Sequence, residues 1–376
     1  MRVLFCSTGG DGHVLPMLPL ARAFSARGDD VTFATPANHR ERIESNGVRF
    51  EPAGPTLDEL KPQLDAHRAS TVDLPPDERR PAAFTGRFAE IEAPRRIDDL
   101  HRLVRTLRPD LVIHESADLS APIAAAAAGV PIVNHSFGQP IPEPALRRAG
   151  GAMAPLWQAA GLEPDELAGV YRGSYITICP PSLLAGLVLP AVRTYPLRPA
   201  DAASAEPGSR SRPAVYATLG TSFNAIATFR VLLDAFAEVD CDVTMTIGRN
   251  RDPGDLDPIP ANVVVERYIP QEAVLANCDA VVAHAGSGTL LATLAQGLPL
   301  VLLPMGADQF ENAAACSEAG VAETILPGDL AAGQVRDTLA RVLGEPSYAT
   351  AAASVAAEIA AMPPAATVAD ELAAQR

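Results

Sequence analysis

The chain opens with Arg2-Val-Leu-Phe-Cys-Ser7, continues into Thr8-Gly-Gly-Asp-Gly-His13, and then into Val14-Leu-Pro-Met-Leu-Pro-Leu-Ala-Arg-Ala-Phe24. The first stretch is a continuous apolar run, the second is rich in glycine, and the third spaces its apolar residues as a helix does. This order predicts a buried strand, a tight turn and a helix, the opening of a parallel α/β sheet.

Short apolar or β-branched runs recur along the chain, separated by polar or helical segments, at 30–35, 110–115, 130–134, 214–219, 242–247, 262–266, 280–283 and 299–303. Strands buried in parallel sheets have this pattern. A proline-rich stretch, 189–213, divides the runs into two series and has the composition of a linker. The fold class is therefore α/β, with two Rossmann-like, doubly wound parallel-sheet domains.

We place the first domain at 1–195, the linker at 196–213, the second domain at 214–350 and a terminal alanine-rich helix at 351–376. Between about 55 and 108 prolines are frequent and the periodicity is weak, so this region is predicted as an insertion over the first sheet, with a charged helical stretch from 77 to 108.

Composition narrows the class of protein. Of the 376 residues, 48% are hydrophobic and 20% are charged, a composition typical of a globular protein. The net charge of -15 argues against a nucleic-acid partner. The five cysteines are scattered and form no Cys-x-x-Cys pair, so neither a disulfide framework nor a zinc site is predicted. No stretch has the pattern of a signal peptide or membrane span, and a cytoplasmic location is expected.

His13 ends the first glycine turn, where open α/β sheets form their ligand crevices. An imidazole there can act as a general base, although it could instead simply cap the following helix. Glu115 ends another predicted strand and could orient His13. Asp11 and Asp118 compete for that role, and Glu115 could also be a solvated loop acid.

The richest cluster is His284-Ala-Gly-Ser-Gly-Thr289, which leads from a predicted strand directly into a helix. Free backbone N–H groups at such a helix start bind phosphates, and His284 can add a side-chain donor. A second turn of small residues, Thr218-Leu-Gly-Thr-Ser222, could present its amides and hydroxyls to the same anion. Two such turns favour a diphosphate.

Three other functional motifs and a zinc site are not supported by the residues present. Gly10-x-Gly12 lacks the third glycine of a dinucleotide turn, because Leu15 stands there. Ser287 lacks the flanking glycines of a hydrolase elbow, with Ala285 and Thr289 in their place. The acidic pair Asp255 and Asp257 lies in a stretch typical of turns. No histidine pair has zinc-ligand spacing.

Taken together, Gly12-His13, Tyr268-Ile-Pro-Gln271, the 284–289 turn, Gly297-Leu-Pro299 and Pro304-x-x-x-Asp308-Gln309 resemble the inverting GT-B glycosyltransferases, particularly actinobacterial enzymes that glycosylate antibiotics. The similarity covers the whole chain. It implies a GT-B fold, with an acceptor-binding first domain, a nucleotide-sugar-binding second domain, a cleft between them, and a terminal helix that crosses back to the first domain.

The resemblance also assigns roles to individual residues. His13 would be the base and Glu115 its partner; Tyr268 would stack on the base of the nucleotide, which Ile269 would bind through its backbone. Asp308 and Gln309 would bind the sugar hydroxyls. The full predicted nucleotide-sugar site comprises Gly220, Thr221, Ser222, Tyr268, Ile269, Gln271, His284, Gly286, Ser287, Gly288, Thr289, Asp308 and Gln309.

One departure concerns the donor. Plant enzymes that use UDP-sugars usually carry a ribose-binding glutamate in the helix after the phosphate turn, where this chain has Ala292. The change favours a TDP-deoxysugar. The acceptor would be a bulky apolar aglycone such as a polyketide or macrolide, near Gly12, Phe84, Phe137 and Trp157. No metal or other cofactor is expected.

The function we predict is an inverting glycosyltransferase that moves a sugar from a TDP-sugar to an aglycone hydroxyl. A GT-B nucleotide-sugar epimerase and a non-catalytic nucleotide-sugar-binding partner of another transferase remain as alternatives. The expected partners are small-molecule donor and acceptor substrates, with neither nucleic acid nor membrane, and a homodimer stays open as the assembly.

Overall fold

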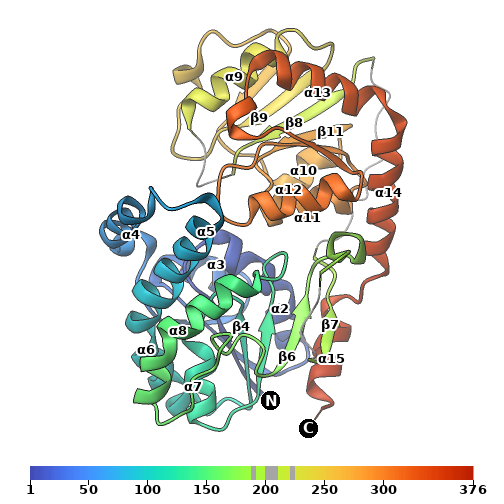
Figure 1. Ribbon diagram of the computed structural model, residues 1–376. Helices are drawn as coiled ribbons and strands as arrows, with labels where there is room; N and C mark the ends of the chain where they lie inside the picture. Colours follow the sequence, from blue (N-terminus) through green and yellow to red (C-terminus); the bar gives the residue numbers. More distant parts are fainter. Residues whose placement is uncertain (188–191, 200–210, 221–224, 376) are drawn as a thin grey trace. The chain divides into compact units, whose positions relative to one another are not determined.

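The computed structural model describes residues 1–187, 192–199, 211–220 and 225–375. The chain forms two compact units (Figure 1). Unit 1 consists of Met1–Ile178, Val188–Leu197 and Pro363–Arg376, and unit 2 consists of Cys179–Leu187 and Arg198–Met362.

Within the described residues, unit 1 is built on seven parallel strands in the order β3-β2-β1-β4-β5-β6-β7. Their bounds are β1 Arg2–Cys6, β2 Asp30–Thr35, β3 Arg49–Pro52, β4 Leu111–Glu115, β5 Ile132–His135, β6 Ser174–Thr177 and β7 Thr194–Pro196. β1 and β4 are paired with Cys6 opposite His114. The glycine turn after β1 and the end of β4 therefore lie at the same edge of the sheet.

Helices cover both faces of this sheet. Alternate residues of β1 point to opposite sides. Leu4 packs in a core with α6 (Ala93–Leu107), α7 (Ala121–Ala127) and α8 (Glu143–Ala159), whereas Phe5 contacts Phe24 of α2 (Leu18–Ala26). The helical segments are α1 Asp11–Val14, η1 Leu15–Met17, α2 Leu18–Ala26, η2 Ala37–His39, α3 Arg40–Ser45, α4 Leu57–Thr71, α5 Pro76–Phe84, η3 Thr85–Glu92, α6 Ala93–Leu107, α7 Ala121–Ala127, α8 Glu143–Ala159 and α15 Ala365–Ala373. The predicted insertion is largely helical, from α4 to α6.

Unit 2 repeats the architecture with six described parallel strands in the order β10-β9-β8-β11-β12-β13. They are β8 Ala214–Thr218, β9 Asp242–Thr246, β10 Val263–Glu266, β11 Ala280–Ala283, β12 Leu300–Leu302 and β13 Ala322–Thr324. The helical segments are η4 Pro181–Leu184, α9 Ile226–Phe236, η5 Pro253–Leu256, α10 Gln271–Leu275, α11 Ser287–Ala295, α12 Gln309–Glu318, η6 Pro327–Asp329, α13 Ala332–Gly344 and α14 Pro346–Ala361. Two doubly wound parallel-sheet domains are thus confirmed.

The carboxyl-terminal segment differs from the predicted single helix at 351–376. Pro363 and Pro364 end α14 at Ala361, and α15 begins after them. The segment Pro346–Ala373 would suit a membrane span by length and composition, but α14 packs on α11 in unit 2 and α15 packs on α2 in unit 1. Each helix therefore packs on its unit through part of its surface, and 28% of the apolar stretch is buried.

The domain boundaries differ in detail as well. Residues 179–187 belong to unit 2, where the backbone N–H of Ser182 donates to Glu358 of α14 at 2.9 Å. Most of the predicted linker, residues 200–210, lies outside the described residues.

Candidate functional site

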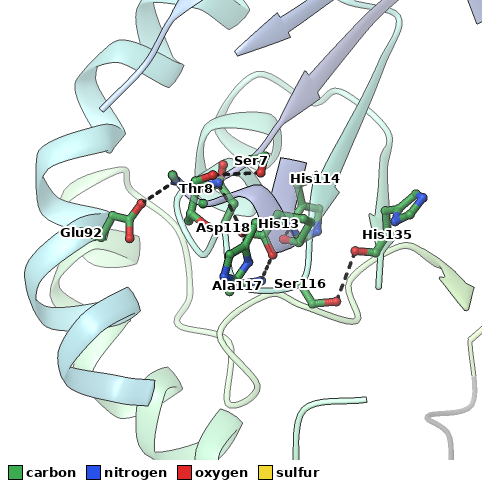
Figure 2. Close-up of polar contacts among 12 residues, drawn as sticks. Ser7, Thr8, His13, Glu92, His114, Ser116, Ala117, Asp118 and His135 are labelled. Carbon is green, nitrogen blue, oxygen red and sulfur yellow. Dashed lines mark hydrogen bonds and ion pairs between the residues drawn. The ribbon is translucent and has the colours of Figure 1, made fainter. Parts of the chain in front are cut away.

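His13 and Glu115 lie side by side at the carboxyl edge of the unit 1 sheet. Figure 2 shows His13 together with Thr8 and Ala117, which also belong to this edge. Nδ1 of His13, in α1, is 3.3 Å from Oε1 of Glu115, at the end of β4. The imidazole side chain is 14% exposed and the carboxylate is fully buried. A buried carboxylate at Nδ1 favours the tautomer that leaves Nε2 as the basic nitrogen.

Glu115 is held as a charged group despite its burial. The hydroxyl and the backbone N–H of Thr8 donate to Oε1 at 2.5 and 3.3 Å, and the N–H of Ala117 donates to Oε2 at 2.7 Å. Burial by itself raises the pKa of Glu115, but the attraction of His13 and the hydrogen bonds from His13, Thr8 and Ala117 outweigh it and lower the pKa to about 2.

The two competing acids have other partners. Asp118 accepts from the buried guanidinium of Arg96 at 2.6 Å, and Asp11 pairs with Arg42 at 3.0 Å. Glu115 is therefore the carboxylate that pairs with His13, and it is buried rather than a solvated loop acid.

A second buried carboxylate, Glu92, supports the same turn, and sequence reasoning missed it. Oε1 of Glu92 lies 3.4 Å from the backbone N–H of Gly9, and Arg87 donates to the carbonyl of Gly9 at 3.1 Å. Burial raises the pKa of Glu92, opposed by the nearby Arg87. Both residues come from η3, an eight-residue π-helix, a form often found at functional sites. Two prolines at 81 and 94 flanking this charged stretch were its only sequence signal.

Aromatic rings surround His13. The ring of Phe137 lies 4.7 Å from the imidazole and that of Phe88 lies 5.5 Å away, and Phe84 contacts Phe88 at 5.0 Å. Gly12 is exposed beside them. These residues can form an apolar floor next to the base.

Trp157 has a different place from the one predicted. Its side chain is fully buried in the unit 1 core, with Arg172 over its ring and Gly169 packed against it. The ring presents no surface to a ligand, so the structure gives Trp157 a core role instead of acceptor binding.

In unit 2 the turn after β11 has the form of a phosphate site. α11 begins at Ser287 with Gly286 as its N-cap, so the amides from Gly286 to Thr289 include the donors at the start of the helix. Ala285 is fully buried with φ of 64°, a conformation that costs a residue with a side chain about 1–2 kcal/mol. Contacts with surrounding residues must therefore stabilise this backbone conformation of Ala285.

His284 lies between two glycines of this site. A Cβ on Gly286 would fall 2.4 Å from its Nε2, and a Cβ on Gly220 would fall 2.5 Å from it, so both positions require glycine. Burial lowers the pKa of His284 to about 4, against the opposing effects of Asp308 and a hydrogen bond with the Thr218 backbone. The ring is neutral at pH 7 and can donate one N–H. Thr221 and Ser222, predicted beside it, lie outside the described residues.

The predicted base-binding residues follow β10. The ring of Tyr268 is 52% exposed, and the guanidinium of Arg249 covers it at 3.5 Å from the ring centroid. Ile269 is half-buried, and Gln271 opens α10. One face of Tyr268 is thus occupied by a cation, which the sequence did not indicate.

Asp308 and Gln309 are tied to neighbouring backbone and side chains. Oδ2 of Asp308 accepts from Ser287 Oγ at 2.7 Å and from Asn312 Nδ2 at 3.0 Å. Oε1 of Gln309 accepts from the N–H groups of Met305 and Gly306 at 2.7 and 3.1 Å. Asp308, predicted to bind the sugar, is therefore joined directly to Ser287 of the predicted phosphate turn. Among the described residues there is no group of three or more His, Cys, Asp or Glu side chains placed to hold a metal ion.

Comparison with known proteins covers nearly the whole chain. Residues 22–184 match the family model of the erythromycin biosynthesis protein CIII-like N-terminal domain, and residues 230–375 match that of its C-terminal domain. L-demethylnoviosyl transferase of Streptomyces niveus is 33% identical over 100% of this chain and 98% of its own length. Elloramycin glycosyltransferase ElmGT of Streptomyces olivaceus is 30% identical over 99% of this chain and 97% of its own length.

A solved structure gives the same fold. SsfS6, a glycosyltransferase of Streptomyces sp. SF2575 crystallised with thymidine diphosphate, superposes with a TM-score of 0.80 at 26% identity, over 100% of this chain and 99% of that chain.

Proposed function

Because the chain belongs to the erythromycin biosynthesis protein CIII-like family of GT-B glycosyltransferases, we propose that it transfers a sugar from a TDP-sugar to a hydroxyl of a bulky, apolar natural-product aglycone. The observation that carries the proposal is the buried, charged Glu115 placed 3.3 Å from His13. Such a pair is what a general base beside an acceptor hydroxyl requires.

In the proposed reaction Nε2 of His13 removes the proton of the acceptor hydroxyl. The acceptor oxygen attacks the anomeric carbon from the side opposite the nucleotide, and the bond from that carbon to the diphosphate oxygen breaks. TDP leaves with the electron pair, and the configuration at the anomeric carbon inverts. Glu115 stabilises the imidazolium that forms, and the proton later passes from His13 to solvent.

The leaving diphosphate is proposed to bind the turn that follows β11. The amides from Gly286 to Thr289 and an N–H of His284 would stabilise the charge that develops on it, and we propose that no metal ion takes part. The close approach of the His284 ring to Gly220 and Gly286, one glycine from each small-residue turn, supports its assignment to the anion.

The nature of the donor rests on two supports. The structure of SsfS6 contains thymidine diphosphate, and α11 carries Ala292 at the position where plant enzymes that use UDP-sugars have a ribose-binding glutamate. The missing glutamate would accept hydrogen bonds from the ribose hydroxyls. Its absence therefore weakens the binding of a nucleotide without the 2′-hydroxyl less than it weakens the binding of UDP. For the acceptor, the rings of Phe84 and Phe137 beside His13 favour an aromatic or otherwise apolar aglycone.

We propose that the reaction takes place in the cytoplasm. The five cysteines of the chain form no disulfide with one another, which suits a reducing compartment.

The proposal is tested with His13→Ala and Glu115→Gln. Transfer from a TDP-deoxysugar to a panel of polyketide and macrolide aglycones is followed by mass spectrometry, and TDP binding by titration calorimetry. We expect His13→Ala to lower kcat/KM by about 10²- to 10⁴-fold and Glu115→Gln by about tenfold or more, with TDP affinity retained in both. His101→Ala on α6 is the matched control and should transfer normally.

Two results would contradict the proposal. Normal transfer by both variants would remove His13 and Glu115 from the chemistry. Conversion of the TDP-sugar into an epimer with no acceptor present would identify a nucleotide-sugar epimerase instead.

A further inference from the structure

Asn312 joins the two parts of the donor site in unit 2. It lies in the first turn of α12 and is 3% exposed. Its amide Nδ2 is placed to donate to the carbonyl of Ala285 at 2.9 Å, to Oγ of Ser287 at 3.0 Å and to Oδ2 of Asp308 at 3.0 Å. No motif in the sequence indicated this residue.

The contact with Ala285 bears on the phosphate turn. Ala285 has φ of 64°, which a residue with a side chain adopts only when its surroundings hold it. In a planar trans peptide the carbonyl oxygen and the following N–H point in opposite directions. By binding the carbonyl of Ala285, Asn312 therefore directs the N–H of Gly286 to the other side, where α11 presents its free amides.

The contacts with Ser287 and Asp308 bear on the sugar-binding carboxylate. Ser287 donates its hydroxyl proton to Oδ2 of Asp308 at 2.7 Å, and Nδ2 of Asn312 lies 3.0 Å from both groups, so that its two N–H protons are shared among them and the carbonyl of Ala285. This arrangement occupies Oδ2 and fixes the rotation of the carboxylate, so that Oδ1 is the oxygen directed elsewhere. It also commits the Ser287 hydroxyl proton, so Ser287 offers a phosphate its backbone N–H rather than its side chain.

We propose that Asn312 is a positioning residue that sets the phosphate-binding turn and the sugar-binding carboxylate as one unit, through the carbonyl of Ala285 and the Ser287–Asp308 pair. The inference rests on the proposed function, because it assigns the turn to the diphosphate of the donor. It also specifies the chemistry needed at this position, an amide donor that neither a carboxylate nor a methyl group can replace.

The test measures TDP affinity by titration calorimetry, with circular dichroism to verify folding. Asn312→Ala should weaken TDP binding about tenfold or more, because the Gly286 amide loses its orientation. Asn312→Asp has the same shape without the amide donors and places a second carboxylate beside Asp308, so it should bind TDP at least as poorly. It serves as the deciding variant if Asn312→Ala fails to fold.

A rescue separates positioning from general stability. Glycine adopts positive φ without strain, so adding Ala285→Gly to Asn312→Ala should recover most of the lost affinity. The matched control is Asn262→Ala, since Nδ2 of Asn262 also contacts three carbonyls of unit 2, those of Phe236, Val239 and Cys241. Asn262→Ala should lower stability and leave TDP affinity unchanged.

The outcomes distinguish this inference from the proposed function. If a folded Asn312→Ala or Asn312→Asp binds TDP as the unsubstituted chain does, or if Ala285→Gly brings no recovery, the positioning role is overturned and the proposed function stands. If the unsubstituted chain does not bind TDP, the proposed function fails and this inference fails with it.

Discussion

Glu115 shows at the scale of a single residue how a buried charge is stabilised. Its carboxylate is out of contact with water, and the cost of burial is offset by Thr8, Ala117 and His13. The same contacts set the orientation of the imidazole. The orientation of the proposed base and the local stability therefore depend on one group, and the pH dependence of unfolding measures the contribution to stability.

Replacement of Glu115 by glutamine should cost stability in a way that depends on pH. The folded pKa is about 2, below the ordinary 4.5, so the contribution of Glu115 is fully present above pH 4.5 and is lost as the pH falls toward 2. A shift of this size corresponds to about 3 kcal/mol at pH 7. Denaturant unfolding of the two proteins at several pH values should show a difference that shrinks below pH 4.5.

The control for that measurement is Glu163→Gln, because Glu163 is exposed. It should change stability little at any pH. An equal difference between Glu115→Gln and the unsubstituted chain at pH 7 and pH 3 would show that the charge of Glu115 does not contribute.

At the scale of elements, the segments that bring residues to the site are irregular ones. The π-helix η3 carries Glu92 and Phe88 to the turn that holds His13, and the short α1 follows Gly10 directly. The regular strands bring the ends of β1 and β4 together. The irregular segments η3 and α1 then determine where the side chains of the site lie. The terminal helix α15 packs on α2, which follows the same turn.

Substitution in α15 should therefore destabilise unit 1 and not the donor site. Leu372 is 5% exposed, and α15 packs on α2. Leu372→Ala should lower the free energy of unfolding by about 2–3 kcal/mol, the low end for buried leucines because a terminal helix can readjust. TDP affinity should be retained, since the described residues that are proposed to bind the donor belong to unit 2.

Denaturant unfolding followed by titration calorimetry checks this expectation, with the exposed Gln375→Ala as a control expected to change stability by less than about 0.5 kcal/mol. A Leu372→Ala protein as stable as the unsubstituted chain would mean that α15 is not held on α2 in solution.

At the scale of the whole molecule, the proposed donor and acceptor sites lie in different units. His13 and Glu115 belong to unit 1, and the phosphate turn, Tyr268 and Asp308 belong to unit 2. Each unit has its own parallel sheet and its own core, so binding of the nucleotide and activation of the acceptor can be measured separately.

Nucleotide binding should raise the thermal stability of the chain in a defined order. A ligand that binds only the folded state stabilises by mass action, by about 2.7 kcal/mol at a hundred times its Kd. We expect TDP to shift the unfolding temperature more than UDP, because Ala292 offers no carboxylate to a ribose, and more than TMP, which lacks the second phosphate. Differential scanning fluorimetry at equal concentrations measures the order.

The matched variant is Ala292→Glu, which should narrow the gap between TDP and UDP by adding the missing carboxylate. A larger shift with UDP than with TDP in the unsubstituted chain would contradict the argument from Ala292. No shift with any nucleotide would contradict the assignment of the turn after β11.

Much of this molecule follows from patterns that are local along the chain. Apolar runs and glycine turns specify two parallel α/β units, and the position of His13 and of the 284–289 turn at strand ends follows from the same patterns. These features depend on the conformational preferences of residues that are adjacent in the sequence.

Contacts between distant residues came from packing alone. Glu115 is the partner of His13 because Arg96 and Arg42 engage Asp118 and Asp11. Glu92 reaches Gly9 across 83 residues, and Trp157 is drawn into the core. Asn312 meets Ala285 only once α12 lies beside α11. Such pairings depend on strand register and on which helix faces meet, and these are properties of the folded chain as a whole rather than of any segment.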